Sequence, residues 1–96
     1  MDLTLLKYLK SFSEGRVRLR HPALRDKAVA DLTRERMAAT PGALSVECNT
    51  LSGSVLLLYD HHRISKERLI TMGTAWARYL DAVRAGQKAD PPSFEA

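Results

Sequence analysis

The chain has 96 residues, of which 45% are hydrophobic and 27% charged, and its formal net charge is +4 at pH 7. This composition is ordinary for one soluble globular domain, and no apolar run reaches the roughly 18–20 residues that cross a bilayer, which excludes a membrane-spanning segment. One cysteine excludes an internal disulfide and favours a reducing, cytoplasmic location.

The N-terminal segment, residues 1–13, is predicted to contain a short amphipathic helix at residues 3–12. On a helical wheel its apolar side chains fall on one side, with Lys7 and Lys10 opposite. Packing against the last helix of the domain is the favoured interpretation. A second copy of the chain, giving a homodimer, and an anionic membrane surface are the open alternatives.

Arginine alternates with apolar residues directly after Gly15. The five residues concerned are Arg16, Val17, Arg18, Leu19 and Arg20. Period-two alternation predicts a half-buried strand, with the apolar side chains toward a core and the arginines on the opposite face. Three guanidinium groups on one face repel each other unless anions, carboxylates or a partner lie nearby. This cluster is therefore the first candidate for a functional surface.

The rest of the chain is predicted to form a helix at 26–39, strands at 44–49 and 54–60, a helix at 65–85 and a flexible tail at 87–96. In the strands, Leu44, Val46 and Cys48 share the inward face, while Leu56 and Leu58 share the outward face with the arginines. The order of elements predicts an α+β fold of the ferredoxin-like, split βαβ type. Its antiparallel sheet has helices on one face, an extra N-terminal helix and a degraded last strand.

Several short motifs follow one another between residues 15 and 60. They are Gly15-Arg16-Val17-Arg18-Leu19-Arg20, Pro22-Ala23-Leu24, Pro41-Gly42-Ala43-Leu44-Ser45-Val46, Asn49-Thr50-Leu51-Ser52-Gly53-Ser54-Val55 and Tyr59-Asp60. In this order they resemble the divergent heavy-metal-associated (HMA-like) domains, relatives of the small copper chaperones and of the N-terminal domains of metal P-type ATPases. The resemblance implies a ferredoxin-like domain at residues 14–86 and a setting in metal transport.

The chain departs from that family at the metal-binding loop. In the relatives, a Cys-x-x-Cys loop between the first strand and the first helix binds a soft metal through two thiolates. The corresponding residues here run from His21 to Asp26 and contain no thiol, so the resemblance does not carry metal binding over. It implies a protein partner, namely a metal-transporting P-type ATPase. Iron is a candidate for the transported metal, because nothing in the sequence suits thiophilic ions.

The three histidines are the remaining candidates for metal ligands. The predicted strands place His21 at one end of the sheet and His61 and His62 at the other, about 20 Å apart. One shared site within a molecule is therefore excluded. His61 and His62 stay as weak candidates for a transition metal, and no cofactor is predicted.

Catalysis is not predicted. Cys48 shares the inward face of its strand, which is typical of an inert buried thiol. The sequence contains no glycine-rich phosphate loop, catalytic-triad spacing or carboxylate pair.

The arginine strand has three interpretations. It forms a solvated face paired with Glu47 and other carboxylates, or it binds a protein or membrane surface, or it binds single-stranded nucleic acid. Two outward leucines beside the arginines favour an interface, whereas nucleic-acid binding on a sheet needs aromatic platforms that these strands lack. The sequence thus predicts a non-enzymatic interaction domain in metal homeostasis that contacts a protein through Arg16, Arg18, Arg20, Leu56 and Leu58. A nucleic-acid-binding module is the alternative.

Overall fold

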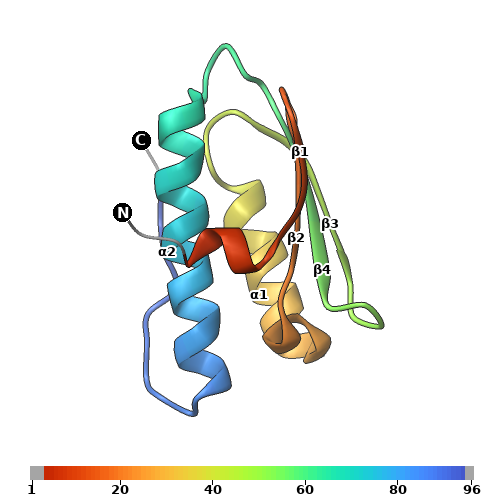
Figure 1. Ribbon diagram of the computed structural model, residues 1–96, viewed down its shortest axis with the longest axis vertical. Helices are drawn as coiled ribbons and strands as arrows, with labels where there is room; N and C mark the ends of the chain where they lie inside the picture. The colour runs from red at the N-terminus through yellow and green to blue at the C-terminus, as the bar shows by residue number, and fades with distance from the viewer. Residues whose placement is uncertain (1–3, 95–96) are drawn as a thin grey trace.

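The molecule has two layers, an antiparallel sheet and two helices that cover one of its faces (Figure 1). The computed structural model describes residues 4–94. The strand order across the sheet is β1-β2-β4-β3. In chain order the elements are the 3₁₀ helix η1 (Leu5–Lys7), β1 (Leu9–Ser13), β2 (Arg16–Arg20), the 3₁₀ helix η2 (Pro22–Arg25), α1 (Lys27–Ala38), β3 (Ala43–Asn49), β4 (Ser54–Tyr59) and α2 (Lys66–Arg84). This arrangement confirms the predicted ferredoxin-like α+β fold.

The central strands β2 and β4 follow the alternation in the sequence. Val17 and Leu19 of β2 are buried, and they pair with the buried Leu57 and Val55 of β4. The three arginines of β2 are exposed on the opposite face. The core therefore lies between the sheet and the helices, as the period-two pattern predicts.

The N-terminal helix predicted at residues 3–12 is wrong for most of its length. Within its described part only Leu5–Lys7 is helical, and Leu9–Ser13 is a strand that pairs with β2. Serine and phenylalanine at 11–13 form helices less readily than alanine or leucine, so the pairing of these residues with Arg16, Val17 and Arg18 outweighs their helical propensity. β1 occupies the edge beside β2, where the last strand of a ferredoxin-like fold would pair, and no strand follows α2 within the described residues.

The inward position predicted for Leu44 is also wrong. The register of β3 against β4 shifts between Ala43 and Ser45, and Leu44 is the extra residue of this bulge. Its side chain is 70% exposed. Beyond the bulge, Val46 and Cys48 face the core as predicted.

α2 holds the N-terminal segment and the tail against the domain. Leu5 of η1 packs on Gly73, at the contact predicted between the N-terminal segment and the last helix. The tail runs back alongside α2 (Figure 1) and places the Phe94 ring 5.2 Å from the Arg68 guanidinium. Within the described residues, no helix combines the length and the hydrophobicity that crossing a membrane requires.

Candidate functional site

Five exposed or half-buried side chains lie on the sheet face opposite the buried side chains of β2 and β4. We call this surface the arginine face, and its members are Arg16, Arg18 and Arg20 of β2 with Leu56 and Leu58 of β4. Arg16 lies directly beside Leu58, and Arg18 lies beside Leu56. Residues paired across antiparallel strands share a face, so the structure brings together all five residues singled out in the sequence.

The positive charge of the arginine face is not balanced locally. Among the carboxylates that the structure describes, none lies within 4 Å of Arg16, Arg18 or Arg20. The interaction recorded for these side chains is a 3.5 Å hydrogen bond from Arg16 Nη1 to Ser11 Oγ. Glu47 pairs with Leu56 and is thus two strands away from Arg18, about 10 Å across the sheet. The predicted pairing with Glu47 has no direct contact in this structure.

The surface beside the arginines is hollowed. Arg18, Glu47, Asn49, Leu51 and Leu56 line a shallow depression between β2 and the hairpin that joins β3 to β4. Leu51, at the tip of this hairpin, is 89% exposed. The sequence shows a turn at residues 49–53 but not that its leucine stands at the edge of a hollow.

His21 begins the loop that lies where related domains carry a Cys-x-x-Cys motif. Its side chain is almost completely buried, at 1% exposure. Nδ1 accepts a hydrogen bond of 3.0 Å from Ala23 N–H, so the ring proton is on Nε2, which donates to Asp81 Oδ1 at 2.9 Å. The same Oδ1 accepts a 2.5 Å bond from Tyr8 Oη, and the Tyr8 and His21 rings lie 4.2 Å apart. This network fastens the loop to β1 and α2.

The network also shifts the acidity of its members. The hydrogen bond to Asp81 raises the pKa of Tyr8, and partial burial and the negative charge of Asp81 act in the same direction. Partial burial opposes ionisation of Asp81, but the hydrogen bonds from Tyr8 and His21 and nearby positive charge outweigh it and lower its pKa. Asp81 is therefore a stable anion at neutral pH.

His61 and His62 lie at the other end of the sheet from His21. Tyr59 N–H bonds to Gly15 O at their end, whereas His21 N–H bonds to Gly53 O. His61 Nδ1 is 3.0 Å from Glu14 Oε1, and the two histidine rings are 4.1 Å apart. Within residues 4–94, no three or more histidine, cysteine or acidic side chains gather in a way that could hold a metal ion.

Cys48 sits on the core side of β3. Its thiol lies 3.5 Å from Ala30 O, and burial raises its pKa. A raised pKa keeps the thiol protonated at neutral pH, and the thiolate is the reactive form.

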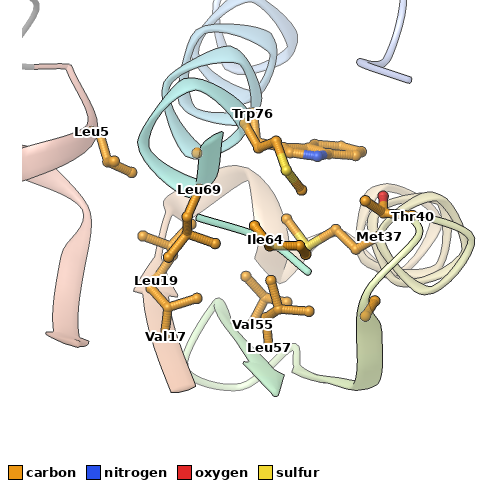
Figure 2. A pocket seen from close by; sticks show the side chains of 13 residues that line it. Leu5, Val17, Leu19, Met37, Thr40, Val55, Leu57, Ile64, Leu69 and Trp76 are labelled. Atoms are coloured by element: carbon orange, nitrogen blue, oxygen red, sulfur yellow. The ribbon is translucent and has the colours of Figure 1, made fainter. Parts of the chain in front are cut away.

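An apolar cavity of about 40 Å³ lies between the sheet and the helices (Figure 2). Trp76 is 2% exposed, and its Nε1–H has no hydrogen-bond acceptor among the described residues. The cavity offers a polar ligand almost no surface to bind, so it belongs to the packing of the core. Its lining is Leu5, Val17, Leu19, Met37, Thr40, Ala43, Val55, Leu57, Ile64, Leu69, Met72, Gly73 and Trp76.

Comparison with known proteins gives one assignment. No curated protein and no solved structure matches the chain. The family described as heavy metal associated domain 2 matches residues 7–82, which include all four strands, α1 and nearly all of α2. The match does not contradict the absence of a Cys-x-x-Cys loop, and the arginine strand and the short motifs that carry the resemblance all lie inside it. The chain therefore belongs to the heavy metal associated domain 2 family.

Proposed function

We propose that this domain is a non-enzymatic accessory module in metal homeostasis that binds a protein partner through the arginine face. Family membership indicates a metal-related role. The observation that carries the proposal is the column of three exposed arginines, without a described carboxylate within 4 Å, beside two outward leucines. Burying the leucines and pairing the arginines with acidic groups of a complementary partner would lower the free energy of such a surface.

The former metal loop supports a role by contact rather than by metal transfer. Both nitrogens of His21 are engaged, Nδ1 by Ala23 and Nε2 by Asp81. A metal ligand needs a free lone pair on one imidazole nitrogen, so His21 would have to leave this network to bind a metal. We propose a metal-transporting P-type ATPase as the partner and iron as the metal it moves. The partner follows from the resemblance of the chain to the N-terminal domains of such pumps, and iron follows from the lack of thiol ligands for thiophilic ions.

Nucleic acid is the alternative ligand for a basic sheet face. Sheet-based recognition of single strands stacks bases on exposed aromatic rings. Tyr59 of β4 is buried, and Phe12 pairs with Val17 on the helix side. A gel-shift assay with mixed single-stranded DNA and RNA at about 0.15 M salt, where non-specific contacts are weak, is expected to show no complex. A retained complex would support the alternative.

The deciding experiment is a pull-down from the native cell with three baits. The first is the wild-type domain, and the second carries Arg16→Ala, Arg18→Ala and Arg20→Ala. The third removes the same charge from the helical layer, through exposed Arg34, Arg36 and Arg84. We expect the first and third baits to capture the same partners and the second to lose them. Capture that is equal with all three baits would refute a role for the arginine face.

A further inference from the structure

We infer that the partner presents an acidic amphipathic α-helix, which lies along β2 and β4 on the arginine face. This inference rests on the proposed function and specifies the partner's shape and charge. It follows from the spacing of the side chains, from the hydrogen-bonding needs of a peptide backbone on a sheet face, and from the charge pattern across the strands.

The spacing of the columns matches a helix. Alternate residues on a strand are about 6.8 Å apart, so Arg16, Arg18 and Arg20 form a column about 14 Å long, and the leucine column of β4 lies about 4.8 Å to its side. Four residues of a helix rise about 6 Å, and a helix about 10–12 Å wide covers two strands. About nine residues with carboxylates three or four positions apart, beside an apolar stripe, thus match both columns.

Backbone hydrogen bonding favours a helix over an extended peptide. A peptide strand satisfies its N–H and C=O groups by pairing with a sheet edge, and above a sheet face these groups would have no partners. A helix satisfies its own backbone and can pack on a sheet face through its side chains alone.

The charge pattern determines which side of the partner helix faces each strand. The central row reads Arg18, Leu56, Glu47, that is, positive, apolar, negative. The partner helix therefore carries acidic residues over β2, apolar residues over β4, and neutral or basic residues over β3. A helix with acidic residues all round would be repelled by Glu47.

Two other occupants of the arginine face, a second copy of the chain and a membrane, are disfavoured. A second copy packed face to face supplies Glu47 against three arginines, which leaves two uncompensated charges on each protomer. A membrane is disfavoured because Leu56 is half-buried and Leu58 is 36% exposed. Leucine side chains are shorter than the arginine side chains beside them, so the guanidinium groups would meet the headgroups before either leucine reached the acyl boundary that an interfacial element penetrates.

The test is selection from a displayed library of random peptides of about 20 residues, long enough for several helical turns. Wild-type domain is the target, and the triple arginine variant is the counter-target. We expect selected peptides to repeat acidic residues every three or four positions beside an apolar stripe. The triple variant should bind them about tenfold more weakly, as three surface ion pairs predict. Circular dichroism of the variant confirms that it is folded.

A charge swap tests whether Arg18 contacts an acidic residue of the peptide directly. Arg18→Glu is expected to weaken a selected peptide, and a lysine at the facing acidic position is expected to restore binding. Acidic residues at every second position, peptides without acidic residues, or no selection at all would overturn the inference. Arginine-dependent binding to anionic vesicles or arginine-dependent dimerisation in sedimentation, in place of peptide binding, would overturn it as well.

The outcomes separate the inference from the proposed function. Arginine-dependent capture of cellular proteins without selected helical peptides would leave the proposed function standing and refute the helix. Selected helices without arginine-dependent capture would show that the arginine face can hold such a helix in vitro, and would refute the proposed function in the cell.

Discussion

The phenol of Tyr8 donates a 2.5 Å hydrogen bond to the carboxylate of Asp81, 73 positions further along the chain. This bond joins the residue before β1 to the last two turns of α2, and the buried His21 shares its acceptor oxygen. The two ends of the domain and the loop from His21 to Asp26 therefore meet at one carboxylate. The stability of the fold should depend on that oxygen more than on any one of its donors.

Substitutions in this network are expected to be unequal and coupled. Tyr8→Phe removes one donor and should lower the free energy of unfolding by about 1 kcal/mol. Asp81→Ala should cost about 2 kcal/mol, because it leaves the buried His21 Nε2–H without an acceptor. In the double variant the Tyr8→Phe effect should largely vanish, which urea denaturation would show. Strict additivity would contradict the network.

The pKa shifts predict opposite effects at the two ends of the pH range. The pKa of Asp81 is lowered in the folded state, so its contribution to stability is present above its unfolded value of about 4 and disappears as the pH falls through the folded value. The pKa of Tyr8 is raised, so its contribution is present below about pH 10 and disappears as the pH rises through the folded value.

The matching measurement is the free energy of unfolding against pH for the wild type, Asp81→Asn and Tyr8→Phe. The difference between the wild type and Asp81→Asn should shrink in acid. The difference between the wild type and Tyr8→Phe should shrink in strong alkali. A difference that stays constant with pH at either end would argue against the corresponding shift.

The loop from His21 to Asp26 is expected to bind no soft metal tightly. Its histidine uses both ring nitrogens, and its other side chains include no thiol. Calorimetric titration with Zn(II), or with Cu(I) under reducing conditions, should show at most weak binding, and His61→Ala with His62→Ala should remove any that remains. Tight binding that survives this double substitution would place a metal site elsewhere.

Gly73→Ala should stabilise the protein only when Leu5 is shortened. An alanine gains up to about 1 kcal/mol of helix propensity over glycine. Its Cβ, however, would lie 3.0 Å from Leu5 Cδ1 and 3.1 Å from Leu5 Cδ2, so Leu5 must move. We expect the single change to be neutral or destabilising in thermal unfolding, and Gly73→Ala to raise stability in a Leu5→Ala background. Equal effects in both backgrounds would rule out the contact.

Salt should stabilise the wild type more than a variant without the arginine column. Like charges on one strand repel strongly at about 0.01 M salt and are screened at about 1 M. The rise in the free energy of unfolding over this range should be smaller when Arg16, Arg18 and Arg20 are all glutamine. The variant with glutamine at Arg34, Arg36 and Arg84 serves as the control, and an identical salt response in both variants would count against uncompensated repulsion.

Local patterns in the sequence predict the local parts of this structure. The alternation from Arg16 to Arg20 gives both faces of β2, with the apolar residues buried and the arginines exposed. The wrong predictions concern residues whose structure depends on contacts with distant parts of the chain. Residues 9–13 show no clean alternation and become a strand because β2 pairs with them, and Leu44 turns outward because of a bulge in register.

The candidate site likewise has a part that the sequence predicts and a part that it does not. The five residues of the arginine face share one parity on two adjacent strands, so the sequence predicts them as a group. The partnership of Tyr8, His21 and Asp81 has no sequence signal, because their separations of 13 and 60 positions follow no secondary-structure period. The hollow beside Leu51 depends on how the β3–β4 hairpin lies over the sheet, which composition does not show.

The place of β1 at the edge beside β2 has a consequence for how the chain folds. A ferredoxin-like sheet whose edge comes from the C-terminus must wait for the whole chain, whereas here a local hairpin supplies that edge and all four strands end by Tyr59. Local pairing lowers the entropy lost on closing the sheet and speeds folding. During synthesis the sheet can therefore be complete while α2 is still inside the ribosome. α1 can already cover part of its apolar side, whereas the part that α2 covers stays exposed until that helix emerges, which makes the nascent chain prone to aggregation at this stage.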